Sequence, residues 1–301
     1  MTHSRLELLV LGDWGRGGTE AQRAVAEGMA KVAESHDAAA VLTTGDNFYD
    51  DGVRDLADAH WIKSFEDVYT HDALQVPWWP TLGNHDHRGR VDAQIAYSRR
   101  DRRWNLPQAY HSRLSVTPDG TRVQTLFLDT APFVGLYRSG GAERIPGIER
   151  YDTDRQLAWV ERRLAETQAD WRIVVGHHPI HSGSPYHGGA VELQERLLPL
   201  LRAGGVHLYL AGHEHDQQHL VDGDLHLVVT GAAAERRPTG RHEKTVFCDD
   251  GLGFASLGID RDALRVRLHS SGGRLLHHTT IQADAGRRQR RPRGRPVTVL
   301  P

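Results

Sequence analysis

Short apolar runs alternate along this chain with longer segments in which apolar residues recur at helical spacing. This alternation is typical of layered strands and helices, and it disfavours an all-β barrel. The apolar runs predict strands over residues 6–11, 39–43, 79–82, 123–128, 173–175, 208–210 and 225–229. The helical spacing predicts helices over residues 19–35, 55–69, 93–99, 153–165 and 191–201. Periodicity alone therefore predicts a layered α/β fold.

The pattern changes after Gly253 to two short alternating strands, FASLGID and ALRVRLHS, joined by a turn at residues 260–262. These strands predict a hairpin that closes one edge of a sheet. Residues 135–154, rich in glycine, arginine and glutamate, predict a long surface loop, and residues 285–301 form a basic tail that we expect to be disordered. No repeat of solenoid length is visible, and neither of these two segments has the character of a domain boundary. We therefore predict one domain over residues 1–284.

Composition and charge narrow the classes of function. A chain of 301 residues with 39% hydrophobic and 25% charged residues can bury a large core. Its formal net charge is −2, and removing the six arginines of residues 286–296 leaves a net charge of −8 on the remainder. No aromatic residue is interleaved with these arginines for base stacking, so we expect no specific binding of nucleic acid.

The cysteine content and the apolar segments bear on the compartment. Cys248 is the only cysteine, so the chain forms no internal disulfide, which favours a reducing compartment. The apolar run near the amino terminus is too short for the core of a signal peptide, and no stretch approaches the ~20 apolar residues of a membrane helix. We therefore expect a cytoplasmic monomer that does not enter a membrane.

Several predicted strands end in a glycine that is followed by a potential metal ligand. The segments are LGDWG with Asp13, TGDNFY with Asp46 and Tyr49, LGNHD with Asn84, His85 and Asp86, VGHHP with His177 and His178, and AGHEH with His213 and His215. Glycine lets the backbone turn tightly at the carboxyl edge of a sheet, where open α/β sheets bind ligands. The set offers oxygen and imidazole donors but no thiolate, which indicates hard or borderline metals. His213 and His215 can face one site only from a loop, which Gly212 permits.

The order of these motifs, GD, GDxxY, GNHD, GHxP and GHxH, resembles that of the metallophosphoesterases, and the tyrosine variant resembles the purple acid phosphatases. The stretch GNHDHRGRVDAQIAYSRRDRRWNLP, residues 83–107, is similar throughout to the small, tartrate-resistant type of purple acid phosphatase. The resemblance implies the metallophosphoesterase fold, a four-layer α/β/β/α sandwich in which two mixed sheets are flanked by helices. It also implies that residues 1–284 form the catalytic domain.

The resemblance further implies a binuclear metal centre. It assigns the first ion to Asp13, Asp46, Tyr49 and His215, and the second to Asp46, Asn84, His177 and His213. The first site is then more anionic by about two charges, which favours Fe(III) there and a divalent ion, Fe, Zn or Mn, in the second. A phenolate of Tyr49 bound to Fe(III) is expected to colour the protein violet.

The activity implied by the resemblance is that of an acid phosphatase, which hydrolyses phosphate monoesters of small substrates by attack of a metal-bound hydroxide. His85 follows Asn84 directly and is expected to assist the leaving group, with Asp86 a candidate to orient its imidazole. His187 is expected to contact the substrate, because the family places a histidine about nine or ten residues past the ligand that matches His177. We expect His178 and His181 to be structural or solvated, and Glu214 to be exposed.

Alternatives remain open at this point. The same metal core serves phosphodiesterases that act on cyclic nucleotides or lipid head groups, and only the rim loops over residues 135–154 and 182–189 would separate these from a monoesterase. A non-hydrolytic iron protein that produces reactive oxygen, or a protein that only senses phosphate, needs no proton donor at the leaving group. The presence of His85 therefore disfavours both of these classes.

Overall fold

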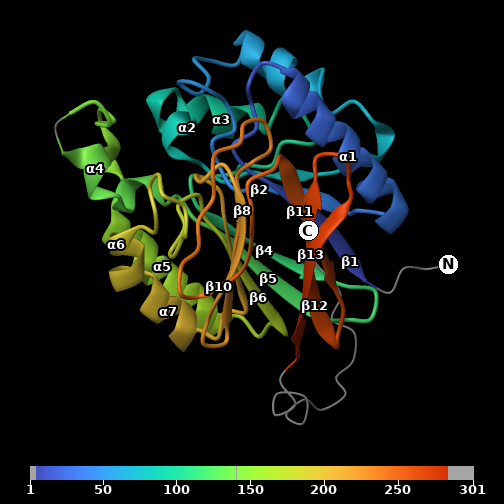
Figure 1. Cartoon of the computed structure of the whole chain (residues 1–301). Coiled ribbons are helices and arrows are strands. Elements are labelled where there is room, and N and C mark those ends of the chain that lie inside the picture. The colour runs from blue at the N-terminus through green and yellow to red at the C-terminus, as the bar shows by residue number, and fades with distance from the viewer. Residues whose placement is uncertain (1–4, 140, 284–301) are drawn as a thin grey trace.

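Two mixed β-sheets lie face to face between layers of helices in the computed structural model, which describes residues 5–139 and 141–283 (Figure 1). This is the four-layer arrangement that the resemblance implies, so the predicted fold class is confirmed. The predicted basic tail, residues 285–301, lies outside the described residues. Within the described ranges, no helix has both the length and the apolar character needed to cross a lipid bilayer.

The first sheet has the strand order β13-β12-β11-β1-β2-β3. Its strands are β1 (Leu6–Leu11), β2 (Ala40–Thr43), β3 (Trp78–Trp79), β11 (Gly253–Ile259), β12 (Ala263–Ser270) and β13 (Leu275–Gln282). The strands β1, β2 and β3 are parallel, whereas β11, β12 and β13 pair in antiparallel fashion. The predicted hairpin after Gly253 is confirmed as β11 and β12, but the edge of the sheet is β13, and β11 lies inside it against β1.

The second sheet has the strand order β10-β8-β9-β7-β6-β5-β4. Its strands are β4 (His111–Val116), β5 (Arg122–Phe127), β6 (Trp171–Val175), β7 (Leu208–Ala211), β8 (Gln217–Asp222), β9 (Leu225–Thr230) and β10 (Thr245–Asp249). Its centre is parallel over β5, β6, β7 and β9, and its margins are antiparallel. Phe127, Val175 and Leu210, which lie at or next to the ends of β5, β6 and β7, are aligned across the sheet. The loops that follow these strands therefore leave the sheet at one edge.

The helices connect the strands on the outer faces. They are α1 (Glu20–His36), α2 (Asn84–Arg88), α3 (Val91–Tyr97), α4 (Gly135–Arg138), α5 (Thr153–Glu166), α6 (Val191–Arg196) and α7 (Leu198–Ala203). The hydroxyl of Thr19 caps α1, and the carboxylate of Asp152 caps α5 by accepting from the backbone N–H of Arg155. Both caps satisfy a donor that the first helical turn would leave without a partner.

Three large apolar clusters hold these layers together. One lies between the sheets and joins residues of both, such as Val10 and Leu257 of the first sheet and Phe127 and Val175 of the second. A second fills the space under α1, and a third lies between the second sheet and the helices α5, α6 and α7. Because both faces of each sheet are covered, the central strands are buried throughout and read as continuous apolar runs in the sequence.

The predicted strands over residues 6–11, 39–43, 123–128, 173–175, 208–210 and 225–229 are confirmed as β1, β2, β5, β6, β7 and β9. The strand over 79–82 was misplaced, since β3 ends at Trp79 and Pro80 has no N–H to give to a ladder. The predicted helix over 191–201 is interrupted at Leu197, where Pro199 in the first turn of α7 cannot continue an α-helical ladder.

The predicted helix over residues 55–69 is confirmed only in part. The segment is helical over residues 59–66, and Trp61–Glu66 is a π-helix. The carboxylate of Asp58 accepts the backbone N–H groups of Arg54 and His60 at 2.9 and 3.0 Å, and such local bonds stabilise a turn in place of a regular helix. The predicted loop over 135–154 contains the short helix α4 and a 3₁₀ turn over Ile148–Arg150.

Candidate metal centre

The loops that follow the parallel strands bring together the seven predicted ligand residues. Each follows the end of β1, β2, β6 or β7, or begins the helix α2. The residues are Asp13, Asp46, Tyr49, Asn84, His177, His213 and His215. All seven are buried, and at most 9% of the surface of each is exposed. A group of polar and ionisable side chains that is so fully removed from water requires partners of opposite charge or a bound cation.

Tyr49 lies at the centre of the first group. Its hydroxyl oxygen is 2.8 Å from Oδ1 of Asp13, 2.9 Å from Oδ2 of Asp46 and 3.1 Å from Nε2 of His215. A phenol has one proton and can donate it to only one of these three acceptors. A cation placed among the four groups would satisfy all of them.

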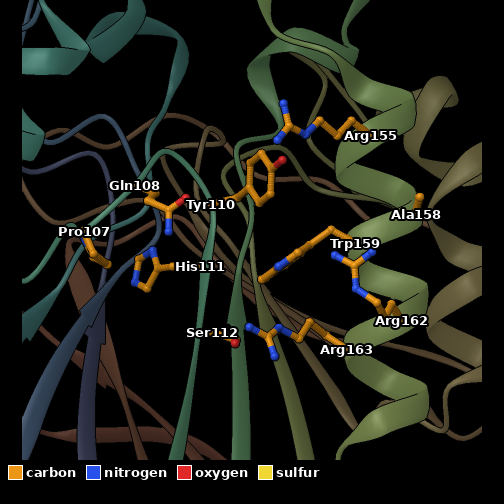
Figure 2. Close-up of a pocket in the computed structure, with 10 residues that line it drawn as sticks. All are labelled: Pro107, Gln108, Tyr110, His111, Ser112, Arg155, Ala158, Trp159, Arg162 and Arg163. Atoms are coloured by element: carbon orange, nitrogen blue, oxygen red, sulfur yellow. The ribbon is translucent and has the colours of Figure 1, made fainter.

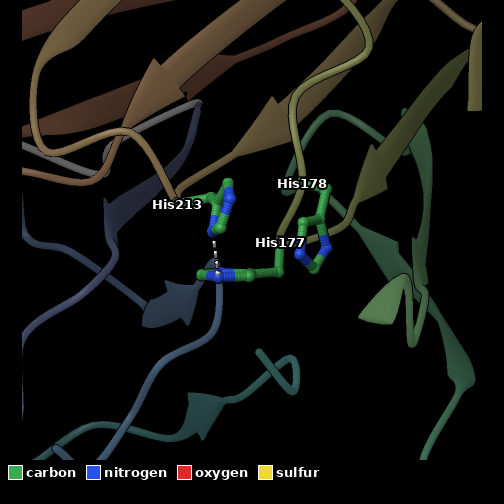
Figure 3. Close-up of side chains that lie close together, drawn as sticks. All are labelled: His177, His178 and His213. Atoms are coloured by element: carbon green, nitrogen blue, oxygen red, sulfur yellow. Dashed lines mark hydrogen bonds between the residues drawn. The ribbon is translucent and has the colours of Figure 1, made fainter. Parts of the chain in front are cut away.

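His177 lies at the centre of the second group. Its Nε2 is 3.0 Å from Oδ1 of Asn84, 3.2 Å from Oδ2 of Asp46 and 3.3 Å from Nδ1 of His213. Figure 3 shows the His177 and His213 rings approaching each other from different loops. The other nitrogen, Nδ1, lies 2.8 Å from the carbonyl oxygen of Thr44, which can only accept, so Nδ1 carries the proton. In neutral His177 the lone pair of Nε2 is therefore aimed at this group, as in a metal-bound histidine oriented by a backbone carbonyl.

The backbone at three of these residues lies in the left-handed region. Asp13, Asp46 and His213 have φ values of 61°, 48° and 69°. Residues other than glycine adopt such values rarely, at a cost of about 1–3 kcal/mol each, and they cluster at functional sites. All three residues lie in the loops that follow β1, β2 and β7, where the backbone leaves the regular strand conformation.

Burial and neighbouring charges strongly perturb the acidity of the group. Burial, assisted by the carboxylates of Asp13 and Asp46, raises the pKa of Tyr49 well above its usual range. Burial also opposes ionisation of Asp46, but His177 and then His85 hold the pKa of this carboxyl well below its usual range. In the absence of a cation, the ionisation of each of these groups therefore depends on the charge of its neighbours. Two carboxylates, a phenol, an amide and three imidazoles form a donor set that suits a pair of hard or borderline cations.

His85 lies beside this centre without being part of either group. Its backbone N–H donates to Oδ1 of Asp46 at 2.8 Å, and its ring lies 4.4 Å from the ring of Tyr49. The predicted role of Asp86 in orienting His85 is wrong. Asp86 accepts from Gly83 and Gln94 at 2.9 and 2.8 Å, whereas Nδ1 of His85 is hydrogen-bonded to the backbone carbonyl of Asp50.

His187 lies at the rim of the second group. Its side chain is 43% exposed, and its ring lies 4.3 Å from the ring of His213. The expectation that Glu214 is exposed is wrong, because Glu214 is fully buried. Its Oε1 accepts the backbone N–H groups of His187 and Gly188 at 3.0 and 2.8 Å, which holds the loop that carries His187.

The other two loop histidines have structural partners, as expected. Nδ1 and Nε2 of His178 each lie 2.9 Å from a hydroxyl, that of Thr130 and that of Tyr137. His178 is close to His177 and His213 in Figure 3, but both of its nitrogens are engaged by these hydroxyls. His181 pairs with Asp222 at 3.0 Å.

Two contacts at the site were missed by sequence reasoning. The guanidinium carbon of Arg16 lies 3.7 Å from the centre of the Tyr49 ring, and Arg16 also pairs with Glu235 at 2.6 Å. Arg16 follows Asp13 by three residues, which is the one sequence signal that it could be near the site. Tyr137, which contacts His178, comes from the predicted surface loop and carried no such signal.

The sequence matches the family of calcineurin-like phosphoesterases over residues 6–217. It is 36% identical to purple acid phosphatase 3 of Arabidopsis thaliana, with 92% of this chain and 78% of that protein covered. It is 34% identical to human tartrate-resistant acid phosphatase type 5, with 93% of this chain and 92% of that protein covered.

Solved structures with low sequence identity share the fold. The structure of GAP50, the anchor in the inner membrane complex of Plasmodium, superposes with a TM-score of 0.82 at 24% identity, covering 93% of this chain and 90% of that one. Purple acid phosphatase PPD1 from yellow lupin seeds gives a TM-score of 0.67 at 15% identity, covering 100% of this chain and 58% of that one. At these identities the likeness bears on the fold alone.

Proposed function

The chain belongs to the calcineurin-like phosphoesterase family and, within it, to the purple acid phosphatases, and we propose on this premise that its seven converging side chains hold the two metal ions of the family's centre. The chain is accordingly a metal-dependent phosphoric monoester hydrolase. The observation that carries the assignment of the site is the position of the Tyr49 hydroxyl, within 3.1 Å of Asp13, Asp46 and His215.

The two groups of side chains support a division of the ligands. Asp13, Tyr49 and His215 would hold the first ion, Asn84, His177 and His213 the second, and Asp46 both. We propose Fe(III) for the first site, because two carboxylates and a phenol favour a small trivalent ion, and divalent Fe, Zn or Mn for the second. When bound, such a pair of cations polarises a phosphoryl oxygen and lowers the pKa of water.

His85 is our candidate for proton transfer to the leaving group. The Asp50 carbonyl can only accept a hydrogen bond, so the bonded Nδ1 of His85 carries a proton. Nε2 is then the nitrogen that can exchange a proton with a substrate oxygen. General acid catalysis of this kind contributes about 10²–10⁴-fold.

His187 is our candidate for contact with the phosphate or with the leaving group of the substrate. Its half-exposed ring faces solvent on one side and His213 on the other. A side chain in this position can reach an ester bound at the metal centre without taking a coordination place. Small phosphorylated molecules are the proposed substrates.

Replacing Tyr49 with phenylalanine tests the metal assignment. The variant removes one oxygen and retains the buried ring, so we expect a folded protein that has lost the violet band of the iron-loaded enzyme. Metal analysis and a visible spectrum of the purified protein measure this. A wild-type protein that is colourless after iron loading, or a variant with an unchanged band, would refute the assignment of Tyr49 to Fe(III).

Replacing His85 with alanine tests the proton donor. We expect the rate of hydrolysis of 4-nitrophenyl phosphate to fall by about 10²–10⁴ with the metal content unchanged. An unchanged rate would remove His85 from the mechanism. The same assay with bis(4-nitrophenyl) phosphate addresses the diesterase alternative, since equal or greater turnover of the diester would favour it.

Three further expectations stay predictions. A cytoplasmic location is supported by the single cysteine, Cys248, which cannot form an internal disulfide. A monomeric state and the lack of specific nucleic-acid binding also await measurement, by light scattering and by titration with oligonucleotides.

A further inference from the structure

A cavity of about 520 Å³ lies between the edge strand β4 and the helix α5, on the outer side of the second sheet. Helix α5 packs with Val160 and Leu164 against the apolar cluster on this outer face, whereas His111 of β4 stacks on Phe127 in the cluster between the sheets. None of the lining residues is a candidate metal ligand. The cavity is therefore separate from the metal centre in the residues that form it.

The charge of the cavity wall is the first observation. Arg155, Arg162 and Arg163 line it, and no acidic side chain does. Glu166 lies 4.0 Å from Arg162 and 3.8 Å from Arg163. Among the described residues, no other carboxylate forms an ion pair with these two arginines, and none does so with Arg155. Outside its basic tail the chain has a net charge of −8, so this wall is opposite in sign to the chain as a whole. Such a wall attracts an anion.

The aromatic rings are the second observation. Tyr110 precedes β4 and Trp159 projects from α5, and their ring centres lie 5.1 Å apart, nearly edge to face. Figure 2 shows both rings in the gap between strand and helix, with the side chains of Arg155 and Arg163 reaching toward β4 on either side of Trp159. Both rings are only partly buried. They give the cavity a flat apolar surface beside its cations.

The combination favours one class of ligand. Arginine pairs with phosphate through parallel hydrogen bonds, and aromatic side chains stack on nucleic-acid bases. A volume near 500 Å³ lies within the range of sites for small molecules. The hydroxyl of Ser112 and the amide of Gln108 add two neutral hydrogen-bonding groups. We propose that this cavity is a second binding site, which takes a nucleoside phosphate with the base on Tyr110 or Trp159 and the phosphate on the arginines.

The test is calorimetric titration of the metal-loaded enzyme with a non-hydrolysable phosphonate analogue of adenosine monophosphate. We expect two sites, one at the metal centre and one in the cavity. The double variant Arg155→Gln/Arg163→Gln should lose the cavity site, with affinity reduced by about 100-fold, since removing one charged hydrogen-bond partner weakens binding by about tenfold or more. Asn84→Ala should weaken only the other site. Both arginine side chains are exposed, so neither substitution disturbs the core.

Controls separate this site from general attraction of anions. Arg99→Gln removes one positive charge at an exposed position outside the cavity and should leave both sites unchanged. Orthophosphate should bind the cavity at least about tenfold more weakly than the nucleoside phosphonate, and Trp159→Leu should abolish this difference. A single site that Asn84→Ala removes would overturn the proposal. Equal affinity for orthophosphate, or equal weakening by Arg99→Gln, would overturn it as well.

Discussion

The buried carboxylate of Glu214 provides a sharp test of how the rim histidine is positioned. Its Oε1 accepts two backbone N–H groups of the rim loop, from His187 and Gly188, and its Oε2 lies 3.6 Å from Nδ1 of His187. Glutamine has the same length and one equivalent acceptor oxygen. The substitution Glu214→Gln therefore removes the charge while it keeps the shape of the side chain.

The expected magnitude follows from these contacts. A hydrogen bond to a charged acceptor is worth about 1.5–3 kcal/mol, against about 0.5–1.5 kcal/mol for a neutral one. Weakening both bonds in this way reduces the free energy that holds the rim loop in place by about 2 kcal/mol. Each 1.4 kcal/mol corresponds to a factor of ten. We expect kcat/KM for 4-nitrophenyl phosphate to fall by about 30-fold, because Glu214 acts on the substrate only by holding His187.

A double-mutant cycle with His187→Ala is the assay. If Glu214 acts through His187, then Glu214→Gln should have no further effect on kcat/KM in the His187→Ala background. Metal content and the visible spectrum should match those of the wild type in all variants. The reasoning fails if Glu214→Gln costs the same factor in both backgrounds, or if activity falls in proportion to lost metal, since either result gives Glu214 a role apart from His187.

Two further predictions concern stability. Gly28→Ala should lower the free energy of unfolding by about 1–3 kcal/mol in spite of its gain in helix propensity, because the added Cβ would lie 2.1 Å from the carbonyl oxygen of Ser271. Urea denaturation measures this free energy, and an increase in it would contradict the prediction. Burial lowers the pKa of His111 to about 4, so the unfolded chain binds more protons than the folded one below about pH 6.5. Stability is therefore lost as pH falls from 6.5 toward 4, and His111→Phe should remove about 2–3 kcal/mol of that loss at pH 4.5, whereas the exposed control His278→Phe should not.

The central strands could be predicted because they are apolar on both faces, but other elements could not. In β8 the residues Gln217, Gln218 and His219 are buried, although their side chains are polar. Gln218 bonds to Asp216 and Ser182, and His219 lies 3.0 Å or less from two other histidines. A strand whose polar groups find partners across the fold carries no hydrophobic signal. Two of these partners, Ser182 and His277, are distant in sequence, so the strand cannot be recognised from local pattern.

The helix predicted over residues 55–69 is longer than the helix observed over residues 59–66, because here the hydrophobic signal is strong but the regular backbone is short. Trp61, Phe65 and Tyr69 recur at the spacing of an α-helix, and all three are buried. Their partners are other aromatic rings: Trp61 stacks on Tyr97 at 3.5 Å, and both Phe65 and Tyr69 contact Trp14. Burial of large rings around Trp14 fixes the positions of these side chains without requiring a regular helix between them. Periodicity thus identified the buried residues correctly but overestimated the length of the helix that carries them.

At the site, the glycines at the strand ends explain which residues could be predicted from the sequence and which could not. A Cβ on Gly83 would lie 2.2 Å from Oδ1 of Asp46, and one on Gly212 would lie 2.3 Å from Oδ2 of Asp13. These glycines are required because the candidate ligand carboxylates pack directly against their backbone, so a glycine at a strand end marks the ligands in the sequence. Glu214 and Arg16 make their contacts through long side chains that constrain no neighbouring backbone to be glycine. No glycine in the sequence therefore indicates their positions. For this reason, the residues that contact the candidate ligands and the rim loop are recognised only in the three-dimensional structure.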